Sequence, residues 1–311
     1  MLIQINNQSV YLSYLSREKI FKIYERGHPS TERGKFYLFL GDLHGNIKAA
    51  IALATRLQVI FGLPLASIFQ VGDFGFWPTG VAAKNEDPHY KKDDALDLYE
   101  IERATDPYQY FRWGNAELES LRAFLYFIRG NHEDFEQLDA IAALQPVEVT
   151  SGIYFIPDYF QGVICDISVV AVGGILTDLE RGRGKRAKDE FKKAQHKLNT
   201  DRRRSNALSL LQSNSQGIDL LLTHSGLASR EQRDGSTQLE AYLQQSSDIC
   251  LHFYGHHHRF SIGNVGASTV SIGLRNLESD AKGILRPGSF ALVIWQERSN
   301  FAIYSDLAIK E

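Results

Sequence analysis

The sequence predicts an α/β fold, and three observations support this class. The apolar run 36–40 leads through the turn 41–46 (GDLHGN) into a helix-like stretch at 47–61, which is the pattern of a strand, a tight turn and a helix. Further apolar runs end at turns that carry polar residues, and they lie at 67–71, 124–128, 220–223 and 251–254. With 311 residues and 43% hydrophobic composition, the chain can bury a sizeable core without disulfides or structural metals.

Side chains that can bind metals follow each of the five predicted strands. Asp42 and His44 stand two residues apart after the first strand, so their side chains can converge. In open parallel sheets, ligands bind where the strands reach their carboxyl ends. We therefore expect one edge of a sheet to collect the ligand-type residues Asp42, His44, Asp73, Asn131, His224, His256 and His258.

The residue types indicate a site for two divalent ions. Such ions, about 3.5–4 Å apart, need mixed oxygen and imidazole ligands and a bridging carboxylate, for which Asp73 is the candidate. Asn131 offers a neutral carbonyl ligand, and none of the clusters contains the thiolates of a structural zinc site. His132, beside Asn131, can protonate a leaving alkoxide. The metals are therefore expected to serve chemistry.

The order of these blocks resembles the calcineurin-like metallophosphoesterase superfamily, whose pattern D-x-H, G-D, G-N-H-(D/E), H and G-H-x-H is matched over 41–258. The resemblance implies a four-layer α/β/β/α sandwich of two mixed sheets flanked by helices. It implies that one metal is held by Asp42, His44, Asp73 and His258, and the other by Asp73, Asn131, His224 and His256. Asp73 would be the bridge between the two.

The resemblance also implies a reaction. A hydroxide that bridges the metals would attack a phosphomonoester or phosphodiester in line, with His132 as the proton donor and phosphate contact. The adjacent Glu133 would orient the His132 ring. Mn²⁺ is the expected metal, with Fe, Zn, Ni or Mg as alternatives, and a phosphorylated small molecule or nucleotide is the expected substrate.

Two other functions stay open. The block 129–133 (RGNHE) resembles that of protein serine/threonine phosphatases, but the Asp-Arg-Gly that those enzymes carry after the bridging aspartate is missing here. The final Gly-His-x-His is the form seen in phosphodiesterase-like and bacterial-type members. A non-catalytic scaffold on the same fold, such as the retromer subunit, has a degraded pattern, whereas this chain lacks no ligand position.

Two further histidines are expected to lie outside the ligand set. His257 occupies the variable position between two ligands, so we expect an exposed or hydrogen-bonded side chain. His252 lies within a predicted strand and is expected to be structural. Glycines at 41, 45, 72, 130 and 255 are expected to permit tight turns close to metals and phosphate.

Charge is unevenly distributed although the net charge is only −3. Between 181 and 204 the basic residues outnumber the acidic ones by eight, and between 86 and 112 the acidic residues exceed the basic ones by four. The basic segment, helix-compatible from 185 to about 212, is either a solvated helical face or a lip that attracts anionic substrates, nucleic acid included. The acidic segment carries several aromatic residues and either caps the site or anchors an insertion.

We expect a single domain over 1–311 with insertions around 80–113 and 178–216, because the ligands run from 42 to 258 and one site cannot be built from separable halves. Cys165 and Cys250 form no disulfide framework. The start of the chain lacks a basic leader, and no apolar run approaches 18 residues. These features predict a cytoplasmic protein that does not enter membranes.

The two ends of the chain carry weaker signals. Residues 11–14 are strand-like and 17–26 are helix-like, with no recognisable chemistry. The tail has strand-like runs at 268–272, 290–295 and 301–304, which are expected to complete the second sheet.

Overall fold

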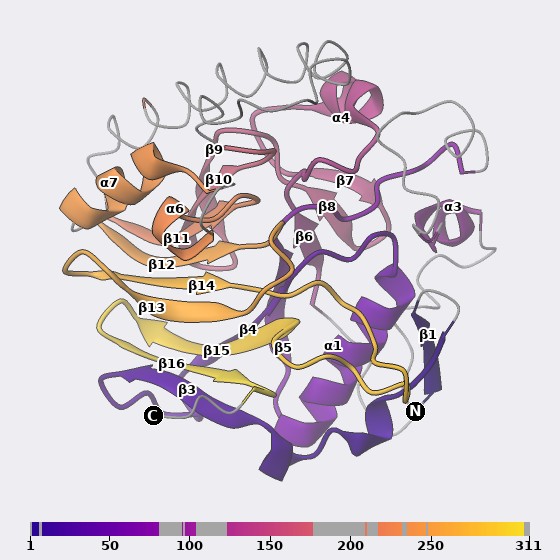
Figure 1. Ribbon diagram of the computed structural model, residues 1–311, viewed down its shortest axis with the longest axis horizontal. Helices are drawn as coiled ribbons and strands as arrows, with labels where there is room; N and C mark the ends of the chain where they lie inside the picture. The colour runs from indigo at the N-terminus through magenta and orange to yellow at the C-terminus, as the bar shows by residue number, and fades with distance from the viewer. Residues whose placement is uncertain are drawn as a thin grey trace, which may run out of the picture.

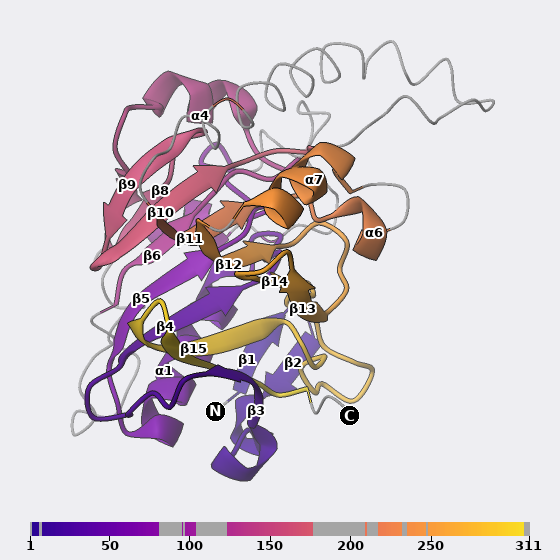
Figure 2. The same ribbon diagram turned by 90° about the vertical axis from the view of Figure 1, so that its left-hand side faces the viewer.

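The protein forms two stacked β-sheets with helices on both outer faces (Figures 1 and 2). The computed structural model describes residues 2–5, 8–80, 95, 97–103, 123–176, 209, 217–231, 235–246 and 248–307. Figure 2 shows the layers in order: helix α1 (Ile47–Phe61), the larger sheet, the smaller sheet, and helices α6 (Ala228–Glu231) and α7 (Thr237–Gln245). The predicted four-layer α/β/β/α sandwich is confirmed.

The larger sheet has eight strands, in the order β3 (Phe21–Arg26), β16 (Asn300–Ser305), β15 (Phe290–Glu297), β4 (Lys35–Leu40), β5 (Leu65–Gln70), β6 (Leu125–Phe127), β8 (Ile153–Phe155) and β7 (Val147–Thr150). Strands β4, β5, β6 and β8 run parallel to one another. Antiparallel strands complete both sides. The sheet is therefore mixed, with a parallel centre.

The smaller sheet has six strands, in the order β13 (Ser261–Val265), β14 (Thr269–Gly273), β12 (Ile249–Tyr254), β11 (Ile218–Thr223), β10 (Ile167–Val172) and β9 (Phe160–Ile164). Its four central strands are parallel and its two edge strands antiparallel. Strands β1 (Leu2–Ile5) and β2 (Gln8–Tyr11) form a separate hairpin. The other helical elements are α3 (Asp97–Glu102), α4 (Phe135–Ile141) and the 3₁₀ turns η1 (Leu12–Tyr14) and η2 (Arg17–Lys19).

Burial on both faces explains the near-continuous apolar strands. In β4, Phe36 and Leu38 pack with α1, while Phe39 points into the core between the two sheets. There the Phe39 ring stacks on that of Phe253 in β12, with centroids 3.8 Å apart. A third core joins the smaller sheet to α7 through Leu239 and other buried residues. These three cores hold the strand ends in fixed positions.

Two predictions about the sheets are wrong. The ligand-bearing strand ends do not share one sheet, since β4, β5 and β6 belong to the larger sheet and β11 and β12 to the smaller. Nor does the whole tail complete the second sheet: β14 joins β12, but β15 and β16 extend the larger sheet beside β4. Both errors concern pairing between distant segments, which local sequence patterns do not encode.

The N-terminal predictions are also wrong. The segment predicted as a helix at 17–26 contains only the short turn η2 and then strand β3, which pairs antiparallel with β16. The strand-like stretch 11–14 is mostly the 3₁₀ turn η1. The open edge of β16 supplies backbone partners that outweigh the weak helical pattern, so tertiary context decides.

Several predictions fall on residues outside those described. The basic segment 181–204 and the proposed helix 185–212 lie there, apart from residue 209, as does most of the acidic segment 86–112. None of the helices in the described part is both long and apolar enough to cross a membrane. Cys165 and Cys250 are both free thiols. The single-domain organisation stays a prediction.

The burial of His252 can be tested through the pH dependence of protein stability. It is fully buried in β12, and its ring nitrogens lie 2.8 Å from Thr223 Oγ1 and 2.9 Å from Ser271 Oγ. Burial, with a smaller contribution from Arg230, lowers the pKa of His252 to about 3. Between that value and the unfolded-state pKa of 6.5, the unfolded chain binds a proton that the folded chain does not. Stability from His252 is therefore complete above pH 6.5 and falls as the pH drops.

We expect His252→Asn to flatten the pH dependence of the free energy of unfolding between pH 6.5 and 4, by up to about 1.4 kcal/mol per pH unit. Urea unfolding across this range measures the slope. The same substitution at the exposed His28 is the control. Parallel curves for wild type and His252→Asn would show that His252 takes up its proton in the folded state.

Candidate metal centre

Backbone conformation aims the polar residues of the strand ends inward. His44, Asp73, His256 and His258 all have left-handed conformations, with φ of 46°, 51°, 65° and 51°. Such conformations cost on the order of 1–3 kcal/mol each in a non-glycine residue, and they persist only where the surroundings enforce them. The chain therefore turns sharply within a few residues of the ends of β4, β5 and β12 and presents these side chains to the shared edge.

Two glycines let these loops approach one another. A Cβ on Gly130 would lie 2.0 Å from Asp73 N, and one on Gly255 would lie 2.1 Å from Asp42 Oδ1. Both distances are far below van der Waals contact. A side chain at either position would therefore force apart the loops that carry the candidate ligands.

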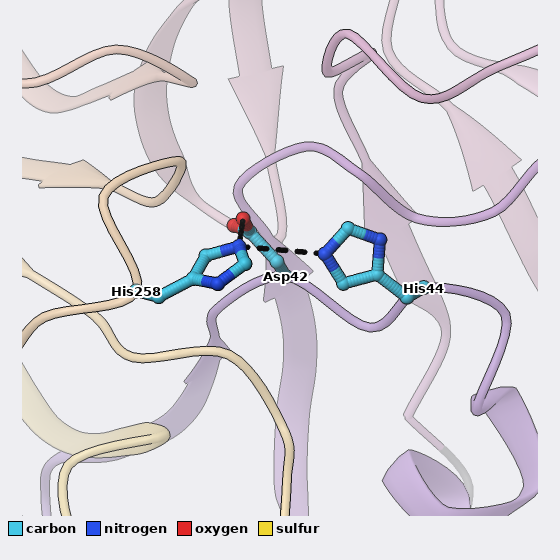
Figure 3. A group of neighbouring side chains, drawn as sticks. All are labelled: Asp42, His44 and His258. Atoms are coloured by element: carbon cyan, nitrogen blue, oxygen red, sulfur yellow. Dashed lines mark hydrogen bonds and ion pairs between the residues drawn. The ribbon is translucent and has the colours of Figure 1, made fainter. Parts of the chain in front are cut away.

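The first group of candidate ligands comprises Asp42, His44 and His258 (Figure 3). His258 Nε2 lies 3.0 Å from Asp42 Oδ2 and 3.4 Å from His44 Nε2. Asp42 is fully buried and also accepts hydrogen bonds from His256 N, at 3.0 and 3.2 Å to its two oxygens. One carboxylate and two imidazole nitrogens thus face the same small volume.

The second group comprises Asp73, His224 and His256, with Asn131 beside it. His224 Nδ1 lies 2.8 Å from Val71 O, and a carbonyl can only accept, so this nitrogen carries a proton. In the neutral ring, Nε2 then offers a lone pair. It points at two other acceptors, Asn131 Oδ1 at 3.0 Å and Asp73 Oδ1 at 3.4 Å. Three acceptors that converge in this way fit a cation.

Asp73 lies between the two groups. Its Oδ2 is 4.0 Å from His44 Nε2 of the first group, and its Oδ1 is 3.4 Å from His224 Nε2 of the second. Oδ1 also accepts hydrogen bonds from Asn131 N at 2.6 Å and His132 N at 2.8 Å. This placement is the one that a bridging carboxylate requires.

The electrostatics of the site favour charged carboxylates. Burial raises the pKa of Asp73, but the surrounding imidazoles, His224 and His44 foremost, lower it more, and the net pKa lies well below the usual range. Burial also raises the pKa of Asp42, but the hydrogen bond from His258 and the neighbouring His224 lower it more, so that the net shift is downward. Burial, with the neighbouring His224, lowers the pKa of His256 to about 3. Negative oxygens next to neutral nitrogens are the donor set of a divalent ion.

His132 lies at the same site, with its ring centroid 5.7 Å from that of His44. The structure therefore brings together all seven predicted ligands and the predicted proton donor. Val71 O, which selects the protonation of His224, is a backbone group that no sequence pattern could have indicated.

The role of Glu133 differs from the expected orientation of the His132 ring. Its fully buried carboxylate accepts hydrogen bonds from four backbone N–H groups, those of Phe74, Gly75, Phe76 and Gly130, at 2.6 to 3.3 Å. Two N–H groups on each oxygen occupy the four lone-pair sites of a carboxylate. No site remains to orient His132, so Glu133 braces the Asp73 loop against the Asn131 loop.

His257 and His252, which were expected to lie outside the ligand set, behave as expected. His257 Nε2 accepts a hydrogen bond from Gly226 N at 3.1 Å, and burial together with His224 lowers its pKa to about 4. His252 is the buried, hydrogen-bonded strand residue described above. Neither belongs to the two candidate ligand groups of the described residues.

Residues 37–260 match the model of the calcineurin-like phosphoesterase family. The match covers well over half of the chain, and the fold and the clustered strand-end residues agree with it. The chain belongs to this family and is therefore a phosphoesterase of the hydrolase class. No curated protein matches the sequence.

Solved structures with this fold come from several organisms. A dimetal phosphatase from Danio rerio is similar with a TM-score of 0.50 and 12% identity, over 88% of this chain and 100% of that one. A calcineurin-like phosphoesterase, YfkN, from Bacillus subtilis has a TM-score of 0.42 and 14% identity, with 91% and 92% covered. A 5'-nucleotidase from Candida albicans has a TM-score of 0.39 and 13% identity, with 90% and 52% covered. At 12% identity, the Danio rerio structure shows a shared fold alone.

The bracing by Glu133 can be tested with Glu133→Gln, which keeps the shape but turns one acceptor group into a donor. Burial, then the Asp73 charge, raise the pKa of Glu133 to about 8, and the N–H groups of Phe76, Phe74 and Gly130 oppose that rise. If the loops need the ionised carboxylate, the glutamine amide nitrogen leaves two buried N–H groups without an acceptor. Each unsatisfied group lowers the free energy of unfolding by about 1–3 kcal/mol.

We expect Glu133→Gln to lower the free energy of unfolding in urea by about 2–6 kcal/mol and to weaken metal binding. Glu136→Gln, an exposed position three residues further on, should change stability by less than about 0.5 kcal/mol. Wild-type stability and metal content in Glu133→Gln would show that a neutral group is sufficient there.

Proposed function

We propose that this protein is a binuclear metal-dependent phosphoesterase that hydrolyses phosphomonoesters or phosphodiesters. The observation that carries the proposal is the position of Asp73 between two groups of candidate ligands. One metal would be held by Asp42, His44, Asp73 and His258, and the other by Asp73, Asn131, His224 and His256.

The metals, when bound, would activate water for in-line attack and polarise the phosphoryl oxygens. Groups of the protein itself would hold the metals and orient the site. Asp73 and Asp42 remain charged because the imidazoles around them stabilise the negative form. The Val71 carbonyl keeps the His224 lone pair directed at the site. The rigid strand ends of both sheets keep these groups in place before substrate arrives.

His132 would donate a proton to the leaving oxygen. Its side chain is half-buried, and its ring centroid lies 5.7 Å from that of His44, so it lies at the site where a general acid is needed. Asp73 Oδ1 accepts a hydrogen bond from His132 N at 2.8 Å, and this bond fixes the backbone of His132. His132 is thus presented to the site from a rigid loop.

The residues after Asp73 argue for a small phosphorylated substrate or a nucleotide rather than a phosphoprotein. Phe74, Phe76 and Trp77 are all buried, and the Phe74 ring stacks on Phe127 with centroids 4.0 Å apart. The side chains of this loop pack into the hydrophobic core. Protein serine/threonine phosphatases instead place a phosphate-clamping arginine in the corresponding loop. Protein phosphatase activity and a non-catalytic scaffold are the alternative functions.

We also propose a single domain over 1–311, Mn²⁺ as the metal with Fe, Zn, Ni or Mg as alternatives, and a cytoplasmic location. Nucleic acid binding through the basic segment 181–204 would rest on residues outside those described. These proposals rest on the sequence and on its resemblance to the family.

The first test of the proposal is metal content. Wild-type protein reconstituted with Mn²⁺ should hold two ions per chain by elemental analysis. Asp73→Asn removes the bridging charge and should weaken both sites by more than the 10–100-fold that is typical when a residue behind a ligand is changed.

Asp166→Asn is a matched control, because Asp166 is also an aspartate in the left-handed region, with φ of 70°, but lies on an exposed hairpin. It should retain two ions. Fewer than one ion per wild-type chain would refute binuclear binding.

The second test concerns His132. His132→Ala should slow hydrolysis of alkyl phosphates, which are poor leaving groups, by ~10²–10⁴-fold. Aryl esters such as nitrophenyl phosphate need little protonation and should slow much less, with metal content unchanged. Equal slowing of both esters would assign His132 to phosphate binding instead. A metal-loaded wild type that turns over neither ester would favour the scaffold.

A further inference from the structure

Helix α3 belongs to the acidic segment 86–112 and packs beside the first turn of α1 (Figure 1). Its apolar residues Leu98 and Ile101 are buried in the core between α1 and the larger sheet. The ring of Tyr99 lies against Gly80, where a Cβ would be 2.3 Å from the ring. The helix is therefore anchored to the body of the protein next to the Asp42–His44 turn.

Asp97, the first residue of α3, caps helix α1. Its Oδ2 accepts a hydrogen bond from Lys48 N at 2.9 Å, and Oδ1 lies 3.8 Å from Lys48 Nζ. A carboxylate there satisfies a free N–H group and interacts favourably with the positive end of the helix dipole.

Helix α1 has no acidic cap of its own. The side chain of Asn46, at the N-cap, caps no helix N–H and instead donates to Leu43 O at 2.8 Å. There is no acidic residue in the first turn of α1. The negative cap comes instead from Asp97, about fifty positions further along the chain.

The residue two positions before Asp97 touches the metal-site loop. Ala95 N donates to His44 O at 2.9 Å, and a Cβ on Gly45, which has φ of 81°, would lie 1.9 Å from Ala95 O. On its other side, His44 N donates to Asp73 O at 2.9 Å. The strained backbone of His44 is thus clamped between Asp73 and Ala95.

We propose that Asp97 is a positioning residue for the metal site of Asp42, His44 and His258. By capping α1 it holds Ala95 against the His44 carbonyl and so keeps the His44 imidazole directed at Asp42 and His258. The inference rests on the proposed function. The other ligand group, Asp73 with His224 and His256, takes no residue from the clamped turn, so loss of Asp97 should affect one metal site more than the other.

The experiment is a Co²⁺ titration of the metal-free full chain, followed by visible absorption and by elemental analysis at limiting free metal. Wild type should bind two ions tightly. Asp97→Ala should bind one ion with near wild-type affinity and the other about 10–100-fold more weakly, the range typical when a residue behind a ligand is changed. Asp97→Asn should lie between the two, because its amide oxygen can still accept from Lys48 N.

Glu100→Gln is the matched control. Glu100 forms an ion pair with the same Lys48 side chain, but its carboxylate is 59% exposed. Its substitution removes the surface ion pair and keeps the α1 cap, so it should bind both ions as wild type does. Circular dichroism and urea unfolding establish whether each variant is folded. If Asp97→Ala does not fold, the metal titration of Asp97→Asn tests the positioning role.

The outcomes are distinct. Two tight ions in both Asp97 variants would overturn the positioning role while the proposed function stands. Equal weakening of both ions would mean that Asp97 supports the fold generally, and would also overturn it. A wild type that binds no pair of ions would refute the proposed function and this inference together.

Discussion

The buried charge of Asp73 is the constraint on which the site depends. The residue is 1% exposed, and a carboxylate in such a place is costly unless it is paired and hydrogen-bonded. Its side chain accepts from Asn131 N and His132 N, and its backbone carbonyl accepts from Leu43 N and His44 N. One residue therefore ties together the loops after β4, β5 and β6, and faces the loop after β11 through His224.

Packing of the two sheets offsets the energetic cost of bringing these loops together. Four of the candidate site residues have left-handed backbones, and tight glycine contacts join the loops, so the edge stores strain that packing elsewhere must offset. The cores on both faces of the larger sheet and behind the smaller one supply that packing. Glu133 contributes locally, because its four N–H partners span the Asp73 and Asn131 loops. The candidate centre is thus preorganised by backbone contacts as much as by its side chains.

Support for the site also comes from outside the family pattern. The first ligand group depends on a turn whose outer side is covered by Ala95, and the segment with Ala95 is held in place by Asp97 on α1. The candidate ligands fit the family pattern, whereas Ala95 and Asp97 lie outside it. The aromatic residues after Asp73 are another such feature, since they fill the core where related protein phosphatases carry a phosphate-binding arginine.

The sequence by itself determined the α/β class, the helix at 47–61, which it placed to the residue, and the eight side chains that meet at the centre. These are local properties, because an apolar run followed by a glycine-bearing turn specifies a strand end whatever else the chain does. Only the tertiary structure decided that the strand ends come from two sheets, that 21–26 is a strand and that β15 and β16 flank β4. The same holds for the four strands between 147 and 172, for the bracing by Glu133 and for the cap by Asp97. Each depends on a partner far away in sequence, and free backbone groups accept whichever partner the packed core brings to them.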